Sequence, residues 1–186
     1  RVAYGATQLP RLAWYAGHGY AVQRLAAQAR SREGIEETPR RQETPRTGDN
    51  RAPVLSNRRL YGDMAELLAR DPDNQQRIFD HAQSVFWVGY IAYERGETKE
   101  AEAQFREYKR LADKLVILNP AKPEWQMEGS YAETNLGVLF YEQGRFAEAE
   151  RAFANGVRLT TAVVAGQKGD SGRQLELGTA INWLAK

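Results

Sequence analysis

GYIAYERGETKEAEAQF (89–105) and GVLFYEQGRFAEAERAF (137–153) are two versions of one pattern, 48 residues apart in the chain. The two stretches share 8 identical residues in 17 aligned positions, whereas composition alone would give roughly one. The shared residues include two glycines and the closing phenylalanine of each copy. A fixed period of this size, carried by helix-forming residues, is typical of proteins built from stacked pairs of helices.

The apolar spacing around this pattern predicts a series of helices separated by turn residues. We expect Ser56 and Thr98 to act as N-cap residues, because a hydroxyl can accept a hydrogen bond from a free N–H of the first turn. Gly96 and Gly144 are expected to end the helices that precede them. The expected helices cover residues 57–70, 75–95, 98–118, 124–143 and 146–164, and a last one opens at about Gln174.

The identical residues suit the crossing of two helices in a hairpin. Gly89 and Gly137 have no side chain, so we expect a second helix to approach closely at these positions. Phe105 and Phe153 are expected to fill the space between one hairpin and the next. Because a single hairpin cannot bury both of its faces, the hairpins must stack on one another to be stable.

The chain divides into three segments by composition and period. Residues 1–30 are expected to form a weak helix, which either covers the end of the helical array or docks elsewhere. Residues 31–52 are polar and rich in arginine, with two Thr-Pro-Arg sequences, and predict a flexible linker. The repeat domain covers 53–186 and comprises a partial repeat (56–72), two repeats (75–120 and 124–166) and a truncated repeat (172–186). We interpret the chain as a piece of a longer protein, because it begins with Arg1 and ends within a helical pattern.

The charge balance argues against nucleic acid as a partner of the repeat domain. Net charge is +2, but residues 1–52 hold 9 Arg against 5 acids, and the remainder holds 17 Lys and Arg against 19 acids. A nearly neutral repeat domain lacks the basic surface that phosphates require. With no cysteine, the chain has no disulfide and no thiol nucleophile. No apolar run is long enough to span a membrane, and we expect a cytoplasmic protein without metal or cofactor.

One short motif invites a catalytic interpretation. Residues 169–172 read Gly-Asp-Ser-Gly, as in the nucleophile loop of trypsin-like proteases. Here the motif lies in an expected loop between helices, and the only histidines are His18 and His81. We expect His81 to be a surface or groove histidine rather than a general base, and we expect no catalysis.

The repeated residues resemble the tetratricopeptide repeat, and the resemblance covers about 55–186. It rests on the spacing between these residues, first in one copy and then in the other: Val88-Gly89, Gly96, Ala101 and Phe105; Leu136-Gly137, Gly144, Ala149 and Phe153. Three features depart from the family: the period of 48 exceeds the usual length of about 34 residues, Val85 and Glu133 stand where the family has tryptophan, and Ala92 stands where it has an aromatic residue. The resemblance implies a right-handed α-solenoid of antiparallel helix hairpins, as in long-period tetratricopeptide regions of large bacterial regulatory proteins.

The resemblance also implies where a partner binds. The first helices of such hairpins line a concave groove, and aromatic side chains there suit an extended or helical peptide. The implied groove residues are Gln83, Phe86, Tyr90, Tyr93, Tyr131, Thr134, Val138, Tyr141, Thr179 and Asn182.

We therefore expect a non-catalytic protein–protein interaction or scaffold module whose partner is another protein or peptide. One alternative is a regulatory sensor region that controls an attached enzymatic or DNA-binding domain. Another is a structural array that self-associates through its open ends. Its truncated last helix would expose Leu175, Leu177, Ile181 and Trp183 if unpaired.

Overall fold

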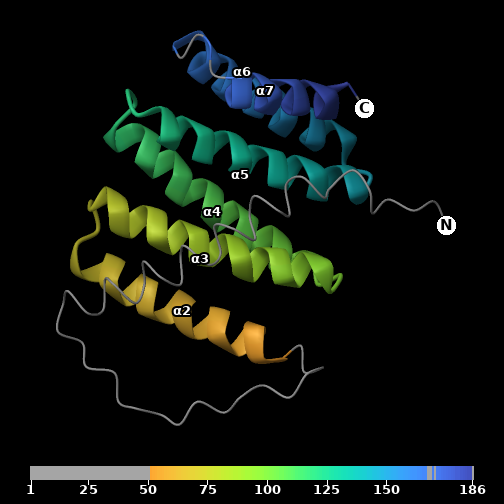
Figure 1. Cartoon of the computed structure of the whole chain (residues 1–186). Helices are drawn as coiled ribbons and strands as arrows, with labels where there is room; N and C mark the ends of the chain where they lie inside the picture. The colour runs from red at the N-terminus through yellow and green to blue at the C-terminus, as the bar shows by residue number, and fades with distance from the viewer. Residues whose placement is uncertain (1–50, 167–168, 170, 186) are drawn as a thin grey trace.

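The described part of the chain is all-α. The computed structural model describes residues 51–166, 169 and 171–185, and the regular elements of this part are helices only. They are α2 (Arg51–Arg70), α3 (Gln75–Glu94), α4 (Thr98–Leu118), α5 (Pro123–Glu142), α6 (Phe146–Gly166) and α7 (Ser171–Leu184). Figure 1 shows them following one another from α2 at one end to α7 at the other, and each packs mainly against the next. The expected segment 1–30 and nearly all of the linker 31–52 lie outside the described residues.

Turn residues place most helix ends where the sequence predicts them. The side chain of Asn74 caps α3 by accepting hydrogen bonds from the backbone N–H groups of Gln76 and Arg77, at 3.1 and 3.2 Å. Gly96 and Gly144 both adopt φ of 72°, a left-handed conformation that glycine reaches without strain. The two glycine turns therefore end α3 and α5 as predicted.

Both N-cap predictions are wrong. Helix α2 begins at Arg51, so Ser56 lies within the helix rather than at its start. Thr98 is the first residue of α4, and the preceding Glu97 holds the cap position without a side-chain hydrogen bond to the helix. The free N–H groups at the start of α4 therefore have no side-chain acceptor at the cap position.

The 48-residue period is repeated in the backbone geometry of the turns. The N–H of Gly96 donates to the carbonyl of Tyr93 at 2.9 Å, and the N–H of Gly144 donates to the carbonyl of Tyr141 at 3.0 Å. The N–H of the residue after each glycine donates to the carbonyl of the residue before that tyrosine. Glu97 donates to Ala92 and Arg145 donates to Phe140, both at 2.9 Å. The two hairpins are therefore closed by the same turn.

The crossing of the helices within each hairpin is as predicted. A Cβ added at Gly89 would lie 2.9 Å from Cδ1 of Phe105, and one added at Gly137 would lie 2.5 Å from Cε1 of Phe153. Both phenylalanines are buried. Each ring therefore occupies the space that a side chain on the first helix would need.

A continuous apolar interior runs from α3 through α6. Its most deeply buried side chains are Ile78, Val85, Phe86, Tyr108, Leu111, Leu115 and Leu139. Val116 is only half-buried, at the edge of this interior. The hairpins share one core, as stacking requires.

Equivalent hydrogen bonds join the first helix of one hairpin to the first helix of the next. Gln83 Nε2 of α3 donates to Glu128 Oε2 of α5 at 2.8 Å. Tyr131 OH of α5 donates to Glu176 Oε1 of α7 at 2.6 Å. Donor and acceptor are both displaced by 48 residues between the two bonds. The period thus governs contacts between hairpins as well as contacts within them.

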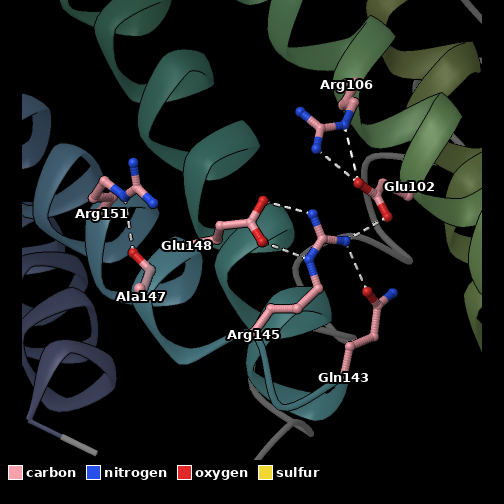
Figure 2. A network of polar contacts seen from close by, with 7 residues as sticks. All are labelled: Glu102, Arg106, Gln143, Arg145, Ala147, Glu148 and Arg151. Atoms are coloured by element: carbon pink, nitrogen blue, oxygen red, sulfur yellow. Dashed lines mark hydrogen bonds and ion pairs between the residues drawn. The ribbon is translucent and has the colours of Figure 1, made fainter.

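Arg145, in the turn between α5 and α6, connects that turn to the preceding hairpin. Its Nη1 donates to Glu102 of α4 at 2.8 Å, while Nε and Nη2 hold Glu148 of α6 (Figure 2). Glu102 also accepts from Arg106 at 2.7 Å, and the Arg145 guanidinium lies 4.2 Å from the centre of the Phe140 ring. The planar, forked guanidinium suits this combination of two carboxylates and an aromatic face.

Candidate functional site

The C-terminal half of α3 carries a run of aromatic side chains in mutual contact. Phe86 is buried, with its ring centre 5.4 Å from Trp87 and 6.0 Å from Tyr90. The ring of Tyr90 in turn lies 6.3 Å from that of Tyr93. Because residues three and four apart share one face of a helix, this run extends from the core to the half-exposed tyrosines near the end of α3.

Two tyrosines of this run are held by carboxylates. Tyr93 OH donates to Glu142 Oε1, at the end of α5, at 2.7 Å. Burial raises the pKa of the Tyr90 hydroxyl, and its hydrogen bond to Glu94 acts in the same direction. Glu94 and Glu142 occupy the same position in the two repeats, and both are exposed. The ends of α3 and α5 therefore present tyrosines and carboxylates side by side.

The end of α5 and the start of α6 carry a second aromatic contact. The ring of Tyr141 meets Phe146, the first residue of α6, edge to face at 5.6 Å, and Phe146 is 62% exposed. Val138 lies one turn before Tyr141 on the same side of α5 and is half-buried. We call the surface formed by Tyr90, Tyr93, Val138, Tyr141 and Phe146 the tyrosine face.

Four of the ten predicted groove residues are buried within the chain. They are Gln83, Phe86, Tyr131 and Thr134. The side chains of Gln83 and Tyr131 make the bonds between first helices, and Thr134 donates to the carbonyl of Ser130 in its own helix. In this structure these four contribute to internal packing, not to a surface that a partner could touch.

The other six predicted residues are accessible to different degrees. Tyr90, Tyr93, Val138 and Tyr141 are half-buried in the C-terminal halves of α3 and α5, whose ends are joined by the bond from Tyr93 to Glu142. Thr179 is half-buried on α7, where its hydroxyl donates to the carbonyl of Leu175, and Asn182 is exposed further along the same helix. Within the part of the chain that the structure describes, no hydrogen bond or ring contact joins these two α7 residues to the tyrosine face, so the predicted set divides into two groups.

A buried carboxyl lies where α3, α4 and α5 meet. Glu128 Oε2 accepts hydrogen bonds from Gln83 of α3 and from Tyr108 OH of α4, the latter at 2.6 Å. Burial raises the pKa of Glu128 to about 7, and the two hydrogen bonds offset only part of that rise. Three helices thus meet at one titratable group, which the sequence analysis did not single out.

The prediction that His81 lies at a surface or in a groove is wrong. His81 is 6% exposed, its ring meets Tyr61 edge to face at 5.2 Å, and burial lowers its pKa. Its Nδ1 lies 3.3 Å from Ser84 Oγ, but Ser84 is also buried and donates to the backbone carbonyl of His81. A serine and a histidine closed off in this way have no access to a substrate.

The described residues offer no assembled metal site. No three side chains among their histidines, aspartates and glutamates converge as metal ligands would. Within the same part of the chain, no helix combines the length and apolarity that crossing a bilayer demands.

Comparison with known proteins adds no assignment. No protein-family model matches this chain, and no curated protein is significantly similar to it. The helices and their contacts therefore define an all-α protein with a repeated hairpin, whose most distinctive surface is the tyrosine face.

Proposed function

We propose that the chain is a tetratricopeptide-like right-handed solenoid acting as a non-catalytic module that binds a peptide or helix of another protein. The recurring contacts support the repeat part of this proposal. The Gly–Phe crossings, the two glycine turns and the bonds between first helices all follow the same 48-residue displacement. A protein made of such repeats grows by adding equivalent units and presents an extended surface.

The tyrosine face carries the binding part of the proposal. Its rings are held by fixed partners, since Tyr93 is bonded to Glu142 and Tyr141 packs against Phe146. Aromatic side chains that are already ordered lose little conformational freedom when a partner docks, and they bring a polar tip with a large apolar area. The exposed Phe146 ring adds apolar area that no neighbouring helix covers fully. A peptide laid across the ends of α3 and α5 would contact these rings together.

An array of immobilised peptides, helical and extended, tests this proposal. We expect a subset to bind the wild-type chain and to lose most of the signal with Tyr93→Ala and with Tyr141→Ala. Ile117→Ala is the matched control, because Ile117 is 78% exposed on α4 and lies outside the tyrosine face. Far-ultraviolet circular dichroism establishes that each variant is folded. If no bound peptide is sensitive to either tyrosine variant, the proposed function is wrong.

A further inference from the structure

The charges of the two sets of helices differ. The first helices α3, α5 and α7 hold seven carboxylates and two arginines, and α5 alone holds four glutamates with no lysine or arginine. The second helices α4 and α6 are close to balanced, with six carboxylates and seven basic residues. The negative charge of the repeat region is therefore concentrated on the helices that carry the tyrosine face.

Within the first helices, burial separates the carboxylates into two kinds. Glu128 is buried and has a raised pKa, and Glu133 is buried beside Lys109 Nζ at 3.1 Å. Glu94 and Glu142 are exposed at the ends of α3 and α5, and among the described residues no lysine or arginine pairs with either. Their negative charge therefore attracts cationic groups that approach the tyrosine face.

Basic side chains of this chain already lie over aromatic rings. Lys122 Nζ lies 3.6 Å from the centre of the Trp125 ring, and Arg145 combines the Phe140 ring with the carboxylates of Glu102 and Glu148. A cation over an aromatic face with a carboxylate beside it gains from both the ring quadrupole and the opposite charge. The tyrosine face offers the same pair of groups: aromatic rings with Glu94 and Glu142 next to them.

We propose that the tyrosine face binds a basic segment of a protein partner, with a lysine or arginine side chain placed between the tyrosine rings and the carboxylates of Glu94 and Glu142. This inference rests on the proposed function and names the chemistry of its partner. Glu142 keeps one oxygen on Tyr93 OH and has a second oxygen for a cation. Because Glu94 and Glu142 are repeat equivalents, two basic residues of one segment can be held by the two hairpins.

Three fluorescein-labelled peptides of about twelve residues test this inference. Their sequences are identical except at four positions, which are all arginine in the first peptide, all glutamine in the second and all glutamate in the third. Fluorescence polarisation at about 150 mM ionic strength measures their affinity. We expect the arginine peptide to bind most tightly. With the double variant Glu94→Gln, Glu142→Gln, its affinity should fall by about tenfold, because glutamine keeps the hydrogen-bond acceptor for Tyr93 and removes only the charge.

The matched control is the double variant Glu124→Gln, Glu150→Gln. Both residues are exposed, and the change in net charge is the same. We expect this variant to bind the arginine peptide as the wild type does. An equal loss in both double variants would mean that total charge alone drives binding, and the inference would be overturned.

Two other results separate this inference from the proposed function. If the glutamine peptide binds as tightly as the arginine peptide and Tyr141→Ala weakens it, the tyrosine face binds peptides without a cation. The inference is then wrong and the proposed function stands. If none of the three peptides binds, the inference is also overturned, and the peptide array decides the proposed function separately.

Discussion

At the scale of single residues, Glu128 shows how a repeat position acquires a property that its equivalent in the next repeat, Glu176, lacks. Its carboxyl is held by Gln83 and Tyr108, two neutral donors that cannot replace the hydration lost on burial. Glu176 occupies the same position one repeat later, but it is only half-buried and has Arg173 at 3.2 Å. Desolvation without an opposite charge therefore explains the raised pKa of Glu128.

The raised pKa predicts how stability changes with pH. The folded chain holds a proton on Glu128 up to about pH 7, whereas the ordinary value is 4.5. Between pH 4.5 and about pH 7 the folded state binds more protons than the unfolded state, because only the folded chain keeps the Glu128 carboxyl protonated. The contribution of this group to the free energy of unfolding is therefore complete below pH 4.5 and is lost as the pH rises through about 7. Urea unfolding from about pH 5 to about pH 8 should show the free energy of unfolding of the wild type falling relative to that of Glu128→Gln.

Other buried groups also have shifted pKa values, which is why the comparison is a difference between two proteins. Burial raises the pKa values of Asp80 and Glu133 and lowers that of His81, so the histidine acts in the opposite sense. These contributions are common to the wild type and Glu128→Gln and cancel. Glu150→Gln, at an exposed position, should follow the wild type. Parallel pH profiles for the wild type and Glu128→Gln would contradict the assignment.

At the scale of helices, the sequence predicted the helix ends that are marked by turn-forming residues and missed the start of α2, which has no such mark. The ends of α3 to α6 lie within two residues of the predicted ones. Gly96 and Gly144 mark the ends of α3 and α5, because glycine reaches the left-handed conformation of these turns without strain. The start of α2 was missed because Ser56 is a good cap residue, and Pro53 suggests a break before it. A proline in the first turn is nevertheless compatible with a helix, since its missing N–H has no partner there.

The helix crossing at Gly137 gives a prediction for a single methyl group. Gly137→Ala would place a Cβ 2.5 Å from Phe153, whose ring is buried and stacked on Trp183 at 5.6 Å, so the ring has little room to move. We expect the free energy of unfolding to fall by about 1–3 kcal/mol, as for other overpacked cores. Urea unfolding measures the change.

Two other helical glycines serve as controls for this substitution. A Cβ at Gly62 or Gly178 would meet nothing within 4 Å, so alanine there should stabilise the chain by up to about 1 kcal/mol through helix propensity. The opposite signs distinguish a packing effect from a backbone effect. If Gly137→Ala is as stabilising as the two controls, the close approach of α5 and α6 at this position is wrong.

The division of the predicted groove residues also has a cause at this scale. The resemblance assigns Gln83 and Tyr131 to the same face as Tyr90 and Tyr93, but the side chains of Gln83 and Tyr131 are bonded to Glu128 and Glu176 of the next first helix. This contact joins residues 45 apart in the chain, and the spacing within one hairpin carries no information about it. Phe146 was missed because the other repeat has Thr98 at that position.

At the scale of the whole array, burial declines towards α7. Leu175 is 74% exposed and Ile181 is 49% exposed, whereas their equivalents, Met127 in α5 and Val85 in α3, are 2% and 0% exposed. A second helix covers α3 and α5 on this side, and no helix of the described residues does so for α7. In a chain of repeats, stability is a sum of units and neighbour contacts, so a unit with one neighbour is the weakest.

Native-state hydrogen exchange tests this gradient. We expect the amides of α7 to exchange by local opening at least about tenfold faster than those of α5, which has helices on both sides. Trp183→Ala should widen the difference, because it removes the ring stacked on Phe153, and should leave α3 unchanged. If α7 and α5 open with equal free energies, the array unfolds as one unit. The 48-residue repeat would then govern how the helices are arranged without dividing the molecule into separable units of stability.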